Sequence, residues 1–165
     1  MAKTMTWRLG KTILMLMILG MGITAFNLRI EEGHGSHEID AQTKKEVLKV
    51  LDDYMATFNA KDLKGWEATY HFPHYRLASG KMSVLETAGL RDSLKAFSGL
   101  VKAGWHHSSW DHRNIVQASE NKVHVDTGFS RFRGDGTKIG SYESLYILTK
   151  ENNKWGVKMR SSYAE

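Results

Sequence analysis

The chain has 165 residues, of which 41% are hydrophobic and 25% charged, enough for one globular domain with a substantial core. It contains no cysteine, which excludes disulfides, thiolate chemistry and cysteine-based metal centres. The formal net charge of +5 includes Lys3, Arg8 and Lys11, and without these three the chain has 20 basic and 18 acidic residues. A nearly neutral remainder lacks the clustered positive charge of a nucleic-acid-binding surface, so we expect no nucleic-acid partner.

An apolar run at residues 12–26 follows the three basic residues. A basic stretch before roughly 7–15 apolar residues is typical of a secretory signal peptide, whereas a membrane span needs about 20. The run reaches that length only by including Asn27 and Arg29. Residues 1–26 are therefore predicted to be a cleaved signal peptide or an uncleaved membrane anchor.

The stretch that follows is rich in Gly, His and Ser, which predicts a linker at residues 27–40 before one domain at residues 41–165. We accordingly expect the domain to be exported, to the periplasm or the cell exterior, or to be anchored to the membrane by its N-terminal segment.

Three helices are expected in the first part of the domain. Residues 41–59 carry apolar side chains three and four positions apart, which predicts an amphipathic helix. A short helix at 63–70 would bring Trp66 and Tyr70 to one face. A third helix is predicted at about 87–102, with an apolar stripe formed by Leu90, Leu94, Phe97 and Val101.

Strands separated by turn signals make up the rest of the domain. Two short strands are expected at residues 75–78 and 81–85. Longer strands are expected at 105–117, 122–133, 139–150 and 154–162. Because short turns join antiparallel neighbours, the predicted fold class is α+β, with three N-terminal helices packed on a mainly antiparallel sheet.

This order of elements resembles the nuclear transport factor 2-like (NTF2-like) superfamily, which includes SnoaL-like polyketide cyclases and ketosteroid isomerases. The resemblance is carried by residues 51–62, 136–149 and 153–157, and residues 71–80 with 160–163 resemble more narrowly a bacterial branch. It implies a cone, in which a curved sheet surrounds the helices and leaves a pocket at its open end. It implies no single activity, because the fold hosts enzymes of several kinds and binding modules.

One hairpin of the predicted sheet suggests a charged pair in that pocket. Matching the apolar faces of strands 122–133 and 139–150 pairs Val125 with Ile147. In this register Arg131 and Glu143 are diagonal neighbours on the inward face. Glu143 is thus a candidate catalytic base and Arg131 a candidate anchor for an anionic ligand, unless the two form a structural ion pair at the rim.

Two histidines lie where the second helix gives way to the sheet. In the fold that this chain resembles, that junction is close to the pocket. The resemblance therefore makes His71 and His74 candidate catalytic residues and Arg76 a candidate ligand-binding residue. The alternative is a purely structural role, in which the neighbouring Pro73 and Phe72 set the turn.

Three more histidines occur in residues 105–112. Strand alternation places His106, Trp110 and His112 on one face and His107, a further ligand-binding candidate, on the other. None of the histidine spacings matches the helical zinc-binding motif. We expect hydrogen-bonded or solvated histidines, no metal and no cofactor.

Aromatic side chains supply the remaining ligand-binding candidates. Tyr54, Trp66 and Trp105 would line an apolar cavity or pack in the core, the commoner role at such spacings. We expect a domain that binds a small apolar or amphipathic molecule. The alternatives are a lyase or isomerase with a His or Glu base, and an interaction module that forms a homodimer through an outer sheet face bearing Tyr142 and Tyr146.

Overall fold

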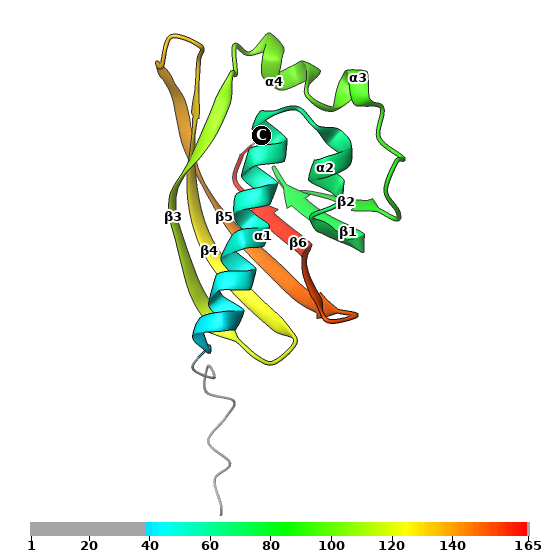
Figure 1. Ribbon diagram of the computed structural model, residues 1–165. Helices are drawn as coiled ribbons and strands as arrows, with labels where there is room; N and C mark the ends of the chain where they lie inside the picture. Colours follow the sequence, from blue (N-terminus) through cyan, green and yellow to red (C-terminus); the bar gives the residue numbers. More distant parts are fainter. Residues whose placement is uncertain (1–38, 165) are drawn as a thin grey trace, which may run out of the picture. The chain divides into compact units, whose positions relative to one another are not determined.

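Helix α1 (Ala41–Asn59) lies along the concave face of a curved six-stranded sheet in the computed structural model, which describes residues 39–164 (Figure 1). The helix begins where the carboxylate of Asp40 accepts a hydrogen bond of 2.9 Å from the backbone amide of Thr43. The stripe that faces the sheet consists of Val47, Leu51, Tyr54 and Met55. The apolar face predicted from the sequence is thus the face with which the helix contacts the sheet.

The sheet has the strand order β2-β1-β6-β5-β4-β3. Its strands are β1 (Tyr70–Ala78), β2 (Lys81–Leu85), β3 (His107–Ala118), β4 (Lys122–Phe132), β5 (Lys138–Glu151) and β6 (Lys154–Ser162). All neighbours are antiparallel except β1 and β6, which run parallel. The parallel pair brings the beginning and the end of the domain together. The predicted α+β cone is confirmed.

An apolar core fills one end of the cone, beside the start of α1. We call this the closed end, and its buried side chains are Val47, Leu51, Val123, Val125, Leu148, Trp155 and Val157. Six of the seven are 0% exposed. This packing closes the cone at one end, so any ligand has to enter at the other.

The helical part differs from the prediction in two places. Helix α2 (Leu63–Glu67) ends early, and Tyr70 already begins β1. A single third helix at 87–102 was wrong: two short helices, α3 (Ser93–Ala96) and α4 (Ser98–Lys102), replace it. The expected apolar stripe is mostly outside the core, with Phe97 buried and Leu94 87% exposed.

The physical reason lies in what this segment faces. We call residues 86–104 the arm, which passes along the open end of the cone (Figure 1). A cavity separates the arm from the sheet, so most of its apolar side chains have no surface to pack on. The carboxylate of Asp92 accepts a hydrogen bond from the Leu94 amide at 2.9 Å, which starts the helical turn only there.

The predicted register between β4 and β5 was also wrong, by one residue. Val125 pairs with Tyr146 instead of Ile147, and Phe129 pairs with Tyr142. Because side chains alternate between faces, this slip turns Glu143 to the outer face and Tyr142 and Tyr146 to the inner face. The apolar pattern predicted that the aliphatic Leu145 and Ile147 face the core, whereas the larger Tyr142 and Tyr146 face it instead.

The predicted signal peptide or membrane anchor, and all but the last two residues of the predicted linker, lie outside the described residues. Within residues 39–164, no helix combines the length and the apolar character needed to cross a membrane.

Candidate functional site

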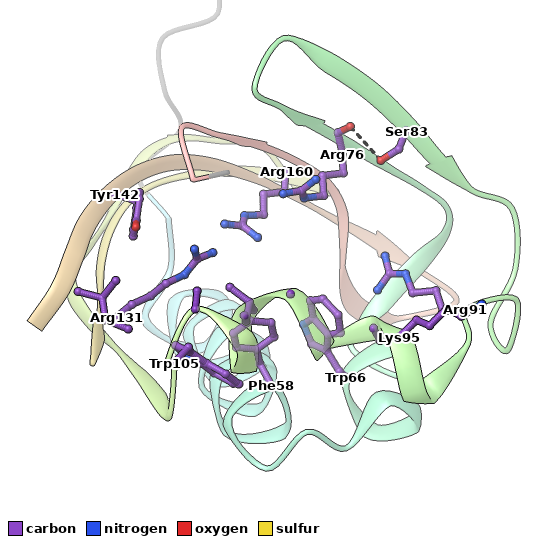
Figure 2. Close-up of a pocket in the computed structure, with 15 residues that line it drawn as sticks. Phe58, Trp66, Arg76, Ser83, Arg91, Lys95, Trp105, Arg131, Tyr142 and Arg160 are labelled. Carbon is purple, nitrogen blue, oxygen red and sulfur yellow. Dashed lines mark hydrogen bonds between the residues drawn. The ribbon is translucent and has the colours of Figure 1, made fainter. Parts of the chain in front are cut away.

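A cavity of about 730 Å³ lies at the open end of the cone, between the sheet, the end of α1 and the arm (Figure 2). This volume is within the range of about 300–1,000 Å³ that is usual for small-molecule sites. Lys95 borders it with a side chain that is 84% exposed, so the cavity reaches the solvent on the side of the arm. A space of about 20 Å³ continues it inward, past Arg131 and Arg160 to Tyr54 and Tyr146.

One wall of the cavity is aromatic. Phe58, near the end of α1, lies 4.9 Å from the ring of Trp66 and 5.0 Å from the ring of Trp105, measured between centroids. Phe97 of the arm packs behind them at 5.5 Å from Phe58. The indole nitrogen of Trp105 donates a hydrogen bond of 2.9 Å to the hydroxyl of Ser108. The rings are tilted to one another by 55–62° and pack into one continuous apolar surface.

Two arginines face this wall from the sheet. Arg76 of β1 and Arg160 of β6 are register partners in the parallel pair, so their side chains are neighbours on the inner face (Figure 2). Arg160 is only 7% exposed and donates to the hydroxyl oxygens of Ser162 at 2.9 Å and Tyr54 at 3.4 Å. Like charges on adjacent strand positions repel, so this pair is unfavourable unless a negative charge offsets it.

A third arginine approaches from β4. The guanidinium of Arg131 lies over the ring of Tyr142 at 4.7 Å and points into the same space (Figure 2). Tyr142 in turn leans over Gly140, where a Cβ atom would come within 2.9 Å of the phenol oxygen. Gly140 is the register partner of Arg131, so the glycine lets the ring take this position beside the guanidinium.

The charges of the cavity are not balanced by acids. Its lining includes Arg76, Arg91, Lys95, Arg131 and Arg160, and no Asp or Glu among the residues that the structure describes. Arg91 has a partial partner in the buried Glu67, at 3.9 Å. Over residues 39–164, none of the three sheet arginines forms an ion pair with a carboxylate, and the Nε atoms of Arg131 and Arg160 are buried without a hydrogen-bond partner.

The surroundings of the sheet arginines shift their pKa values. Burial lowers the pKa of Arg76, and the charge of Arg160 lowers it further. Burial also lowers the pKa of Arg131, against an opposite contribution from Tyr142. Burial works against the charge of Arg160 as well, but Tyr146 and Tyr54 raise its pKa above the ordinary value. All three stay charged at neutral pH, and a bound anion would relieve their repulsion.

Most of the predicted ligand-binding residues line this space. Trp66, Arg76, Trp105 and Arg131 border the main cavity, and Tyr54 borders its inner extension. His107 does not. Its ring stacks on Phe132 at 5.1 Å, and its Nδ1 lies 3.1 Å from the Nδ1 of His106.

The predicted catalytic histidines are placed elsewhere. His74 is 3% exposed, stacks on Tyr70 at 3.9 Å, and donates from Nδ1 to the carbonyl oxygen of Val157 at 3.0 Å. Burial, with a contribution from Arg91, lowers its pKa to about 4, so it is neutral at pH 7. His71 contacts Thr149 at 2.9 Å and Glu151 at 3.5 Å, and burial lowers its pKa. Neither borders the cavity.

Glu143 is a correction to the predicted site. It pairs with Gly128 and contacts His112 at 3.5 Å on the outer face of the sheet, so it is not a diagonal partner of Arg131 inside the cone. The cause is the register slip described above. A bulge between Trp110 and His112 likewise places these two residues on opposite faces, where simple alternation predicted one face.

Several lining residues were missed by sequence reasoning. Arg160 is the most important of them. Residues 154–163 contain no acid, which is a weak signal for an unpaired arginine, but alternation from Val157 would place Arg160 outside. A register shift in the pairing of β5 with β6 turns it inward. Arg91 lies in the arm, whose path the sequence does not specify.

Comparison with protein families supports one assignment. The family model described as NTF2-like protein (DUF6841) matches residues 45–163. No curated protein matches the chain in sequence.

Solved structures share the fold at low sequence identity. A protein of unknown function with a cystatin-like fold from Nostoc punctiforme is 14% identical, with a TM-score of 0.63 over 78% of this chain and 95% of that chain. A ketosteroid isomerase-like protein from Erwinia carotovora is 17% identical, with a TM-score of 0.56 over 75% and 97% of the two chains. An NTF2-like protein from Shewanella oneidensis is 12% identical, with a TM-score of 0.56 over 73% and 98%. These likenesses establish the fold alone.

Proposed function

This chain belongs to the NTF2-like protein family (DUF6841), and we propose that its cone binds a small amphipathic anion without changing it chemically. The anionic group would lie among Arg76, Arg131 and Arg160, with the apolar body against the aromatic wall. A fold of this family is suited to ligand binding or to isomerase-like chemistry, and the side chains decide between them.

The observation that carries the proposal is that, among residues 39–164, no carboxylate pairs with the sheet arginines. A buried charge without a partner costs several kcal/mol in general, so such groups are retained where they serve a function. Arg160 is 7% exposed, and its nearest polar partners are hydroxyl groups rather than carboxylates. Guanidinium groups match carboxylate, sulfonate and phosphate oxygens in a bidentate geometry.

The aromatic wall defines the rest of the ligand. Phe58, Trp66 and Trp105 offer an apolar aromatic surface opposite the arginines (Figure 2). A ring or short hydrocarbon chain packed there would bury apolar area, at about 25 cal/mol per Å². The ligand class that fits both walls is a carboxylate, or a similar oxyanion, on a planar or aliphatic body.

The enzyme alternative receives less support. A lyase or isomerase of the expected kind needs a His or Glu base in the cavity, and the lining residues within 39–164 include neither. The dimer alternative rested on Tyr142 and Tyr146 at the outer face, and both side chains are on the inner face instead. Binding without chemistry is therefore the function that we propose.

The site of action is a separate proposal, drawn from residues 1–26. Their basic and apolar pattern supports export or tethering of the domain. An alkaline phosphatase fusion after residue 40 would be active only if this segment carries the enzyme across the membrane. An inactive fusion would contradict export and leave the cavity proposal unaffected.

A direct test is native mass spectrometry of the full chain, purified in mild detergent from its source. We expect a retained small molecule with a titratable acid group. A protein that carries only neutral lipids, or an organic cation, would contradict the proposal.

A pair of probes isolates the contribution of charge. We expect 2-naphthoate to quench tryptophan fluorescence with at least about tenfold tighter binding than the neutral 2-naphthylmethanol, because one charged hydrogen-bonded pair contributes about 1.5–3 kcal/mol. Arg131→Met should remove most of this preference. Lys122→Met is the matched control, since Lys122 is an exposed basic residue of the same strand and does not line the cavity. Equal affinity for both probes, or equal effects of both variants, would overturn the proposal.

A further inference from the structure

Three metal-ligand side chains meet on the outer face of the sheet, away from the cavity. His112 of β3, Asp126 of β4 and Glu143 of β5 each offer one donor atom, and these atoms all lie within 4.8 Å of one another. The Nε2 of His112 is 3.3 Å from a carboxylate oxygen of Asp126 and 3.5 Å from one of Glu143. The proposed ligand site shares none of these residues.

The distances agree with the geometry of a bound ion. Zinc binds imidazole nitrogen and carboxylate oxygen at about 2.0–2.2 Å in a tetrahedron, which separates neighbouring donors by about 3.3–3.6 Å. The two distances from His112 are at this spacing. Imidazole nitrogen and carboxylate oxygen are both ligand types that zinc and related divalent ions accept.

The backbone brings the three ligands together on rigid elements. They come from three adjacent strands, and none lies in a turn. The bulge between Trp110 and His112 turns the imidazole to the outer face. Gly128 gives it room, since a Cβ atom there would be 2.6 Å from the ring and 3.4 Å from a carboxylate oxygen of Glu143.

The negative charge of the two carboxylates also favours a bound cation. Within residues 39–164, neither Asp126 nor Glu143 forms a salt bridge with Lys or Arg, so the imidazole is the only partner of both carboxylates. Two carboxylates on adjacent strands repel each other unless a positive charge lies between them. The side chains of His112, Asp126 and Glu143 are 36%, 47% and 63% exposed, which leaves the site accessible to an ion and its waters.

We propose that His112, Asp126 and Glu143 form a site for a divalent transition-metal ion of the zinc type, with water in the open positions. The expectation of no metal from the sequence rested on linear spacing within one stretch. These ligands come from three strands, and their spacing appears only in the folded sheet. The site is independent of the proposed function of the cavity.

A protonated His112 would hold the same carboxylates without a metal, and the test separates the two cases. The full chain, without a polyhistidine tag and freed of metal with a chelator, is titrated with Zn²⁺ by calorimetry and thermal unfolding. We expect a rise in Tm of about 2–4 °C at saturating Zn²⁺, and little effect of Mg²⁺. Co²⁺ bound at the site should give the visible absorption typical of tetrahedral coordination.

Variants then assign the site. Each of His112→Asn, Asp126→Asn and Glu143→Gln should weaken Zn²⁺ binding by at least about tenfold, judged against the metal-free form of the same variant. Gly128→Ala keeps all three ligands but displaces the imidazole, and it should weaken binding as well.

Matched controls are His124→Asn, on the outer face of the same strand as Asp126, and Glu120→Gln in the adjoining turn. Both should bind Zn²⁺ as the unchanged chain does. The proposal is overturned if Zn²⁺ neither binds nor raises Tm, or if the ligand variants and the controls lose affinity equally.

Discussion

The two ends of the cone are built by the same elements and have opposite properties. At the closed end, α1, β4, β5 and β6 contribute Leu51, Val125, Leu148 and Val157, all 0% exposed. At the open end the same four elements contribute Phe58, Arg131, Tyr142 and Arg160 to the cavity. One continuous inner face thus changes from a sealed apolar core to a charged site within a few residues of each strand.

Strand β4 shows the change most clearly. Its inward side chains run from Val123 and Val125 through Thr127 and Phe129 to Arg131. The first three are fully buried and the last borders the cavity. The packed core and the proposed ligand site are therefore separated along the strands, so changes at either end should affect mainly stability or mainly binding.

The largest effect is expected from a cavity at the closed end. Leu148→Ala should lower the free energy of unfolding by about 2–5 kcal/mol, because a fully buried leucine is removed from a tightly packed core. Urea unfolding measures this loss. Leu94→Ala in the arm, where the side chain is 87% exposed, is the control and should change it by less than about 0.5 kcal/mol. Naphthoate affinity of the folded Leu148→Ala protein should be unchanged, and a large loss would show that the two ends are coupled.

A pH-dependent loss of stability comes next. The pKa of His74 is about 4 in the folded chain and about 6.5 when unfolded, so the unfolded chain binds more protons between these values. The free energy of unfolding is therefore unaffected by the titration of His74 above about pH 6.5. It falls as the pH drops from 6.5 toward 4, by up to about 3 kcal/mol.

Urea unfolding at several pH values tests this expectation. His74→Asn keeps a side-chain donor for the Val157 carbonyl and should flatten the pH dependence. His107→Asn, a histidine outside the core, should leave the slope as it is. An unchanged slope in His74→Asn would assign the acid sensitivity to other groups.

The smallest effect, and the one opposite in sign, is expected at the open end. Arg131→Met should raise the unfolding free energy of the ligand-free domain by about 1 kcal/mol, because it removes an unpaired charge among Arg76 and Arg160 and keeps an apolar stem. Thermal unfolding of the ligand-free protein measures it. Lys122→Met, at an exposed position of the same strand, should have no such effect. Destabilisation by Arg131→Met would mean that the guanidinium supports the fold.

Local sequence patterns were sufficient for most of the fold. The spacing of Val47, Leu51 and Tyr54 specified α1, and the turn signals between the long strands fixed their order. These features depend on neighbours within a few residues. The arm was not predictable in this way, since Leu94 belongs to a helical stripe that finds nothing to pack on.

The site was predictable only in part, because the sequence does not reliably show which face of the sheet a strand side chain points to. Trp66 and Trp105 were named as aromatic candidates and Arg76 from the family resemblance. Arg131 was named from alternation within its own strand, which does not depend on the pairing with β5. Glu143 and Arg160 were assigned to the wrong face or missed, since a slip of one residue, or a shift in strand pairing, reverses every side chain beyond it. Nothing in a linear pattern marks such irregularities.

The parallel pairing of β1 with β6 has a consequence for when the site exists. Arg76 is synthesised well before Arg160, and the two become neighbours only when β6 joins the sheet. A partly synthesised chain, or one kept unfolded for transport, therefore lacks the proposed anion site. Whatever ligand the protein holds must be acquired by the finished domain, in the compartment where that domain folds.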